Sequence, residues 1–269
     1  MLTRLPVRYG VWGKLSLFKH GDMEHPEYAF GVFRTHYERA GFEGRGVSFV
    51  ALELGPGDSL FSALIAKAYG ASKTYLVDVT PAARCDISLY TGMASFLSAQ
   101  GFSVAEFENC QTLEGLLGVC SAHYLVEGLS SLRQIPSSSV DFIWSQAVLE
   151  HIRRDDFFPT LQELRRVQRA DGVGSHRVDL RDHLGDGLNN LRFQSSTWES
   201  DFMAKSGFYT NRLRYTEMLQ LFRQAGFKVE VLNCERWAEL PTLRHKMAAP
   251  FRDLTEEELS ISGFDVLLR

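Results

Sequence analysis

With 269 residues, 45% of them hydrophobic, the chain can bury one sizeable core, and we expect a single elaborated domain. A formal net charge of -4 gives no overall attraction to polyanions and argues against a nucleic-acid partner. The N-terminus lacks the apolar core of a signal peptide and no stretch is long enough to cross a bilayer, so we expect a cytoplasmic protein without stable membrane insertion.

The first segment, residues 1–45, is expected to form a helical cap. In "HPEYAFGVFRTHYERAGF" the residues Tyr28, Val32, Phe33 and Tyr37 recur at helical spacing, and a proline stands near the expected start. We expect this helix to lie against the main domain and to help close its pocket.

From Val47 onward, short apolar runs alternate with amphipathic helices. The expected strands are "VSFVALEL", "KTYLVDV", "AHYLVEG", "VDFIWS" and "GSHRVDL", separated by segments such as "SLFSALIAKAYG" and "DDFFPTLQELRRV". A helix, "YTEMLQLFRQAGF", a strand, "KVEVLNC", and the run "GFDVLLR" follow. Continuous apolar strands that alternate with helices predict an α/β domain over residues 46–269, with a parallel sheet covered on both faces.

The stretch "ELGPGDS" follows the first expected strand and should form a ligand-binding loop. Ligands of such sheets collect at the carboxyl ends of the strands. Gly55 and Gly57 permit backbone angles that other residues avoid, although glycines also make plain tight turns. Asp78 ends the second strand, where an acid can accept hydrogen bonds from both hydroxyls of a ribose. The pair favours a nucleoside-containing ligand.

A dinucleotide is disfavoured as this ligand. Its fingerprint needs a third glycine where this chain has Leu60, and Asp58 would repel a pyrophosphate. A cofactor with a ribose and an ammonium group but no phosphate fits better, because Glu53 and Asp58 then attract it. S-adenosylmethionine meets that description.

At this point the sequence resembles the class I S-adenosylmethionine-dependent methyltransferases. "ELGPGDS" is similar to their first motif, Asp78 to their ribose-binding acid, and "VDFIWSQAVLEHI" to their fourth strand and the loop after it. The resemblance covers about residues 47–269. It implies a Rossmann-like sheet of seven strands in which "GFDVLLR" is the antiparallel terminal strand. The segments "SHRVDLRDHL" and "LNNLRF" are in addition similar to methyltransferases found with bacterial surface-polysaccharide enzymes.

The resemblance also implies a set of cofactor-binding residues. Gly55 and Gly57 would line the methionine and ribose, and Asp78 would hold the ribose. After the third strand, Leu129 and Ser130 are expected to flank the adenine. The remaining members of the expected set are Glu53, Ser145 and Gln146.

Two histidines are candidates for a general base. Methyl transfer to oxygen needs alignment of donor and acceptor and removal of a hydroxyl proton, and imidazole suits neutral pH. His151 follows the fourth strand, and His183 follows the fifth with Asp182 beside it as a possible orienting carboxylate. The alternatives are that Glu150 and His151 cap a helix, and that the acids near His183 form salt bridges at a strand end.

A metal site is not expected. Asp179, Asp182 and His183 could supply ligands, but the E-x-x-E-H metal motif of some methyltransferases has Ala147 in place of its first acid. The four cysteines show neither zinc nor disulfide spacing.

The long segment of about residues 181–213 is expected to be a substrate-binding insertion. Long insertions in compact domains are usually functional, and its amides, arginines and aromatics suit a polyhydroxylated or anionic acceptor. An ordinary surface loop is the alternative. The candidate acceptor-binding residues are Asp179, Asn190, Arg192 and Trp198.

We therefore expect an S-adenosylmethionine-dependent O-methyltransferase acting on a sugar, a glycan end or another small polar hydroxyl compound. Transfer to nitrogen or carbon remains open. A nicotinamide oxidoreductase and a non-catalytic adenosyl-binding subunit are weaker alternatives. The sequence leaves the acceptor and the oligomeric state undetermined.

Overall fold

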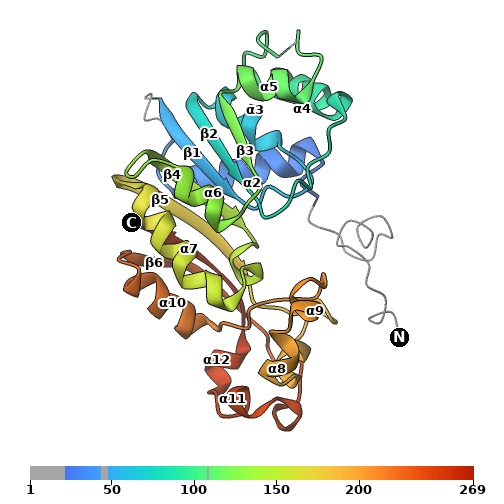
Figure 1. The fold of residues 1–269 in the computed structure, drawn as a ribbon, viewed down its shortest axis with the longest axis vertical. Coiled ribbons are helices and arrows are strands. Elements are labelled where there is room, and N and C mark those ends of the chain that lie inside the picture. The colour runs from blue at the N-terminus through green and yellow to red at the C-terminus, as the bar shows by residue number, and fades with distance from the viewer. Residues whose placement is uncertain (1–21, 44–47, 108) are drawn as a thin grey trace.

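The structure is a computed structural model that describes residues 22–43, 48–107 and 109–269. The chain forms one open sheet of seven strands in the order β3-β2-β1-β4-β5-β7-β6 (Figure 1). Strand β7 is antiparallel to both of its neighbours, and the remaining pairs are parallel. This topology confirms the predicted fold class. Residues 1–21 and 44–45 of the predicted cap lie outside the described residues.

The strands match the apolar runs of the sequence. They are β1 (Phe49–Leu54), β2 (Ala71–Val77), β3 (Ala122–Leu125), β4 (Val140–Gln146), β5 (Gln168–Asp179), β6 (Val229–Arg236) and β7 (Ile261–Leu268). Strands β1 and β4 are buried on both faces, which explains why adjacent positions, such as residues 49–52 and 142–144, are apolar rather than alternating. Within the described parts of the chain, no helix combines the length and apolar character needed to cross a membrane.

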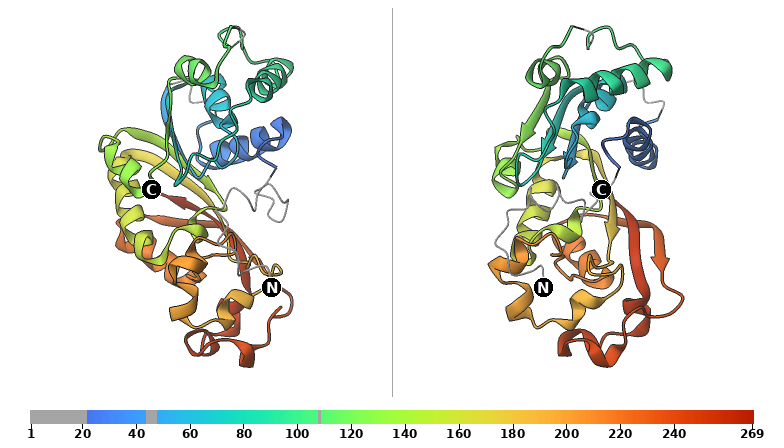
Figure 2. Two further views of the ribbon diagram at one scale, coloured as in Figure 1. Left: turned by 45° about the vertical axis from the view of Figure 1, so that its right-hand side comes forward. Right: turned by 90° about the vertical axis from the view of Figure 1, so that its right-hand side faces the viewer.

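Helices cover both faces of the sheet (Figures 1 and 2). One face carries α2 (Pro26–Arg39), α3 (Phe61–Ala68), α4 (Ile87–Ala99) and α5 (Leu113–Val119). The other carries α6 (Leu129–Gln134), α7 (Arg154–Val167) and α10 (Tyr215–Gln224). Strand β4 serves both cores, because Phe142 and Trp144 pack into the first and Ile143 into the second.

Helix α2, the described part of the predicted cap, packs on the sheet itself. Phe33 meets the rings of Phe142 and Trp144 edge-on, with ring centroids 5.9 Å apart in each case. Arg39 forms a two-pronged ion pair with Asp265 of β7 (2.9 and 3.1 Å). The helix therefore crosses the sheet from α3 and α4 toward the C-terminal strands.

Two connections leave the sheet and together form a small lobe. The first, residues 180–214, follows β5, and the second, residues 237–260, joins β6 to β7. Their helices are η3 (Asn189–Arg192), α8 (Ser195–Trp198), α9 (Asp201–Ala204), η4 (Arg244–Lys246), α11 (Ala249–Arg252) and α12 (Glu256–Ser260). A separate apolar cluster fills the lobe, with Leu188 and Leu191 from the first connection and Met247, Phe251 and Leu259 from the second.

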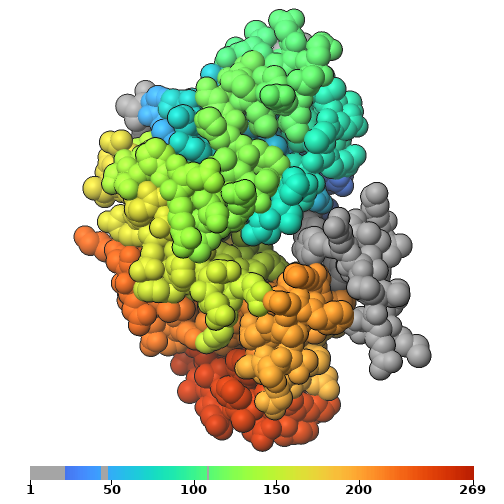
Figure 3. Space-filling model, in the orientation of Figure 1, coloured from blue at the N-terminus to red at the C-terminus, as the bar shows by residue number. Residues whose placement is uncertain are grey.

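A buried arginine fastens this lobe to the sheet. The Arg214 guanidinium donates to the carbonyl oxygens of Leu180 (3.2 Å), Glu258 (3.2 Å) and Ile261 (2.6 Å). Burial lowers the pKa of Arg214 to about 10. In Figure 3 the lobe, in orange and red, forms one end of the molecule, and α4 and α5 form the opposite end.

Candidate functional site

The loop after β1 contains two glycines with different surroundings. Both have positive φ, +73° for Gly55 and +68° for Gly57. A Cβ on Gly55 would lie 2.5 Å from Cγ2 of Val148, whereas a Cβ on Gly57 would meet nothing within 4 Å. Close packing therefore requires glycine at position 55, and position 57 leaves open space beside the backbone.

Asp78 directly follows β2 and lies against this loop. Its Oδ2 accepts a hydrogen bond from the Gly57 N–H (3.1 Å), and its Oδ1 accepts one from the Val79 N–H (2.7 Å). The structure thus brings together two residues that the sequence placed in one site. Each carboxylate oxygen can accept more than one hydrogen bond, so this geometry is compatible with additional hydroxyl donors.

The loop after β3 joins the same edge. The Gly128 N–H donates to the Asp78 carbonyl (2.8 Å), and a Cβ on Gly128 would come within 3.0 Å of Val79. Leu129 and Ser130 begin α6 directly afterwards; Leu129 is half-buried and Ser130 is exposed. The carboxyl ends of β1, β2 and β3 therefore meet at one place, as expected for a ligand site of a parallel sheet.

Glu53 adds a buried carboxyl group beneath the loop. The residue is 2% exposed, and its Oε2 has no hydrogen-bond partner. Burial, with a smaller contribution from the negative charge of Asp78, raises the pKa of Glu53 to about 8. An uncompensated buried acid of this kind favours a cation and disfavours an anion such as pyrophosphate.

The end of β4 carries Ser145 and Gln146, which face opposite sides of the sheet. Ser145 is fully buried, and its hydroxyl lies 2.8 Å from Nδ1 of His176. Gln146 is half-buried, and its Oε1 lies 3.0 Å from Nε2 of His36. His36 belongs to α2, and sequence reasoning missed it because nothing local links that helix to the end of β4.

The two candidate bases lie side by side. His151 ends a short turn, η2 (Leu149–His151), after β4, and His183 lies in the loop after β5. Their ring centroids are 4.9 Å apart with the planes at 59°. Nδ1 of His151 donates to the carbonyl of Tyr209 (3.0 Å), so in the neutral ring the basic nitrogen is Nε2.

Asp182 shapes the loop that carries His183. Its carboxylate is buried and accepts hydrogen bonds from the N–H groups of Leu184 (2.7 Å) and Asn189. These contacts position the loop backbone, which is a different role from direct orientation of the ring. Helix capping does not involve His151, since α7 starts only at Arg154.

Glu150, next to His151, is a second buried acid. Its Oε1 accepts from the Asp179 N–H (3.1 Å), and its Oε2 has no partner. Burial, with a smaller contribution from the negative charge of Asp179, raises the pKa of Glu150 to about 8. This neutral carboxyl links the end of β5 to the turn that carries the histidine.

The four candidate acceptor residues have unlike surroundings. Asp179 is paired with Arg181 (2.6 Å), and Arg192 is exposed. Trp198 is fully buried and donates to the carbonyl of Thr210 (2.7 Å), and Asn190 is buried and donates to the Thr210 hydroxyl (2.9 Å). Asp179 thus lies at the end of β5 and Arg192 at the surface of the lobe, whereas the other two lie inside the lobe.

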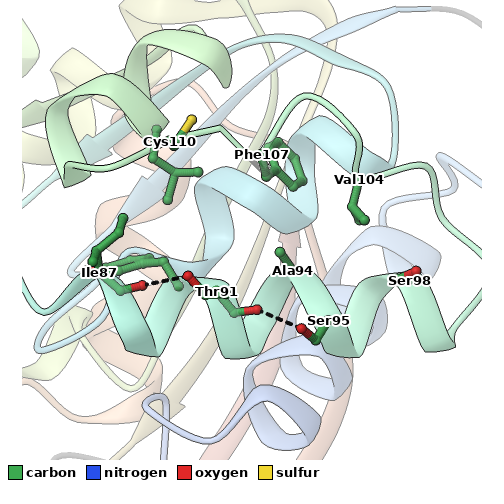
Figure 4. Close-up of a pocket in the computed structure, with 10 residues that line it drawn as sticks. Ile87, Thr91, Ala94, Ser95, Ser98, Val104, Phe107 and Cys110 are labelled. Carbon is green, nitrogen blue, oxygen red and sulfur yellow. Dashed lines mark hydrogen bonds between the residues drawn. The ribbon is translucent and has the colours of Figure 1, made fainter.

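Two hollows lie away from this edge. One, of about 270 Å³, is bounded by α4, α5 and the loop between them (Figure 4). The Thr91 and Ser95 hydroxyls on its wall already donate to carbonyls of their own helix. The other is a shallow groove along β3 and α5. Neither is lined by the loops after β1 and β4. Among the described residues, no three His, Cys, Asp or Glu side chains are placed to hold a metal ion.

Comparison with known proteins gives one sequence match. Residues 52–174 match a family model described as "Methyltransferase domain". No curated protein matches the chain.

Several solved structures resemble the chain weakly. The YcgJ protein of Bacillus subtilis is 15% identical, with 90% of this chain and 96% of that chain covered and a TM-score of 0.46. A SAM-dependent methyltransferase of Archaeoglobus fulgidus is 12% identical, with 91% and 96% covered and a TM-score of 0.45. For the DhpI–SAH complex the identity is 12%, the coverage 97% and 92%, and the TM-score 0.46.

The matched segment runs from β1 into β5 and includes the loops that carry Gly55, Asp78 and Gln146. It therefore covers the strand ends that carry the candidate cofactor residues, whereas His183 lies outside it. This match indicates a methyltransferase domain in residues 52–174, on a seven-stranded sheet with the topology of the predicted fold, and supports S-adenosylmethionine as its cofactor.

Proposed function

We propose that the protein transfers a methyl group from S-adenosylmethionine to a hydroxyl of a sugar, a glycan end or another small polar acceptor. The observation that carries this proposal is the pairing of His151 and His183, 4.9 Å apart, at the edge of the sheet that also holds the cofactor motifs. When bound, the cofactor supplies a methyl group on a positively charged sulfur, which an acceptor oxygen takes by in-line displacement as the carbon–sulfur bond breaks.

The residues at the edge fit this cofactor in both charge and space. The carboxyl of Glu53 suits the ammonium of the methionine part, since it is a buried acid with an unpartnered oxygen. Asp78 suits the ribose hydroxyls, and Gly57 leaves room beside the backbone. Leu129 and Ser130 would flank the adenine; their position directly after Gly128, whose N–H donates to the Asp78 carbonyl, supports this role.

The base is proposed to be Nε2 of His151, with His183 as its neighbour or substitute. The Tyr209 carbonyl fixes the proton of His151 on Nδ1, so Nε2 can take the proton of the acceptor hydroxyl. The ring centroid of His183 lies 4.9 Å from that of His151, so a nitrogen of His183 can accept the same proton. Asp182 would serve by holding the loop of His183.

The acceptor is proposed to bind between the sheet edge and the lobe. Arg192 and the Asp179–Arg181 pair offer exposed charged groups that suit a polar or anionic ligand. Trp198 and Asn190 would contribute indirectly, because both stabilise the interior of the lobe.

The test is methyl transfer from labelled S-adenosylmethionine to a panel of sugars and small hydroxyl compounds by wild type, H151A, H183A, the double variant of both histidines and the control H245A. His245 is exposed on η4 in the lobe. Loss of a general base should lower kcat by about 10²- to 10⁴-fold without changing S-adenosylhomocysteine affinity, and H245A should match wild type.

Other results would identify the alternatives. Full turnover by both single variants and by the double variant would contradict the histidine base and favour transfer to nitrogen or carbon. Stabilisation by NADH but not by S-adenosylmethionine in thermal melts would indicate an oxidoreductase. Cofactor binding without transfer to any acceptor of a broad panel would favour a non-catalytic adenosyl-binding subunit.

A further inference from the structure

Helix α2 reaches the end of β4 through one buried side chain, His36. The residue is 1% exposed, and its ring lies against Trp144 with centroids 5.3 Å apart. Neither the proposed cofactor residues nor the proposed base includes it. Burying an imidazole is costly unless its nitrogens are hydrogen-bonded, so its partners indicate what it does.

Both ring nitrogens of His36 are engaged. Nδ1 lies 2.8 Å from the Ser175 hydroxyl on β5, and Nε2 lies 3.0 Å from Oε1 of Gln146. Burial lowers the pKa of His36 to about 4, so the ring is neutral near pH 7 and carries one N–H. Because the amide oxygen of Gln146 can only accept, that N–H is on Nε2, and Ser175 donates to Nδ1.

This chain of hydrogen bonds fixes the amide of Gln146. With Oε1 held by His36, the NH₂ group is the end available to a ligand, and no partner for it occurs among the described residues. Gln146 is the last residue of β4 and half-buried. A held NH₂ group at the carboxyl edge is a donor for an oxygen of a bound molecule.

The strand order identifies which oxygen this is. Asp78, the ribose residue, follows β2; Glu53 and the glycines belong to β1; and Gln146 ends β4, on the other side of β1. A ligand whose ribose lies over β2 therefore extends its amino-acid end across β1 toward β4. The ammonium of that end would lie near the Glu53 carboxyl, and the carboxylate would then lie toward Gln146.

We propose that His36 is a positioning residue that holds the Gln146 amide so that its NH₂ group donates to the amino-acid carboxylate of the cofactor. The inference rests on the proposed cofactor site and deepens it. It gives the N-terminal helix a part in cofactor binding through a side chain that does not itself touch the ligand.

Two ligands that differ in the relevant group provide the test. S-adenosylhomocysteine carries the carboxylate, whereas 5′-methylthioadenosine keeps the adenosine and sulfur but lacks the amino-acid end. Calorimetric titration of wild type, H36A, Q146A and the double variant should show S-adenosylhomocysteine affinity reduced about tenfold in each single variant. The double variant should lose no more than Q146A, and 5′-methylthioadenosine affinity should be unchanged throughout.

The proposal is overturned if H36A binds S-adenosylhomocysteine as wild type does, if both ligands weaken equally, or if the two losses multiply in the double variant. Should H36A fail to fold, S175A and Q146M replace it. S175A removes the hydroxyl that holds Nδ1, and Q146M removes the amide at nearly constant volume. Each should lower the affinity for S-adenosylhomocysteine and leave that for 5′-methylthioadenosine unchanged. An equal change in both affinities, or no change in either, would overturn the proposal. If wild type binds neither ligand, the proposed function itself fails.

Discussion

Replacing Glu53 with glutamine should make the free protein more stable and a poorer cofactor binder. Glu53 has a pKa of about 8 in the folded chain, against 4.5 for an ordinary glutamate, chiefly because it is buried. An acid whose pKa rises on folding contributes its full stability below the unfolded value and loses it as the pH rises toward the folded value. The contribution of Glu53 to the stability of wild type therefore falls between pH 4.5 and 8.

The size of this effect follows from the two pKa values. Each pH unit in that interval is worth about 1.4 kcal/mol, so the buried carboxyl costs about 3 kcal/mol at pH 7 and about 4 kcal/mol at pH 8, where it is half ionised in the folded chain. Glutamine is nearly isosteric and does not titrate. The stability difference between E53Q and wild type should therefore be near zero at pH 4.5 and should grow with pH.

Urea unfolding at several pH values between 4.5 and 8, followed by tryptophan fluorescence, measures this difference. Binding offers an independent readout, because a cation beside Glu53 should drive its ionisation. We expect wild type to release close to one proton on binding S-adenosylmethionine at pH 7, measured by calorimetry in buffers of different ionisation enthalpy, and E53Q to release fewer.

Glu150 is a matched control for these experiments. It is equally buried and its pKa is likewise about 8, but it lies after β4 next to His151. E150Q should show the same pH-dependent stabilisation as E53Q and the proton release of wild type. A stability difference for E53Q that does not change with pH, or proton release that persists in E53Q, would refute the account of Glu53.

Three further predictions concern the loops, the lobe and the histidines. G55A should be destabilised by several kcal/mol in thermal melts, because its Cβ would lie 2.5 Å from Val148. G57A should lose only about 1 kcal/mol, from its positive φ, but should weaken S-adenosylhomocysteine binding. Equal stabilities of the two variants would contradict the difference in packing. R214M should destabilise the protein by about 3 kcal/mol in urea, since four carbonyl groups, including that of Leu259, lose their donor; an unchanged midpoint would show that the lobe is held by other contacts. Burial lowers the pKa of His176 to about 3, so folding favours its neutral form and its contribution to stability is lost as the pH falls below about 6.5. H176N should therefore lose less stability than wild type between pH 7 and 4.5, measured by urea unfolding; equal losses would contradict this.

Much of the fold could be predicted from the sequence because its signals are local. A strand covered on both faces needs apolar residues at adjacent positions, and residues 49–52 of β1 and 142–144 of β4 show this pattern. The last run, "GFDVLLR", likewise becomes β7 between two antiparallel neighbours. The glycine loop and Asp78 were also visible, since their roles depend on their places directly after strands.

The parts that sequence reasoning missed depend on contacts between distant segments. The second connection, residues 237–260, has no periodic apolar pattern, because its apolar residues face those of the first connection in one small core. For the same reason Trp198 looked like a ligand-stacking residue and is fully buried. The pairing of His36 with Gln146 spans 110 positions of the chain and leaves no local sign.

A crystal structure with S-adenosylhomocysteine bound tests the central claim most directly. The account predicts the ribose hydroxyls within hydrogen-bond distance of the Asp78 carboxylate, the ammonium on the side of Glu53, and the sulfur facing the loops of His151 and His183. An adenosine bound at any other part of the surface, or a ribose out of reach of Asp78, would contradict it.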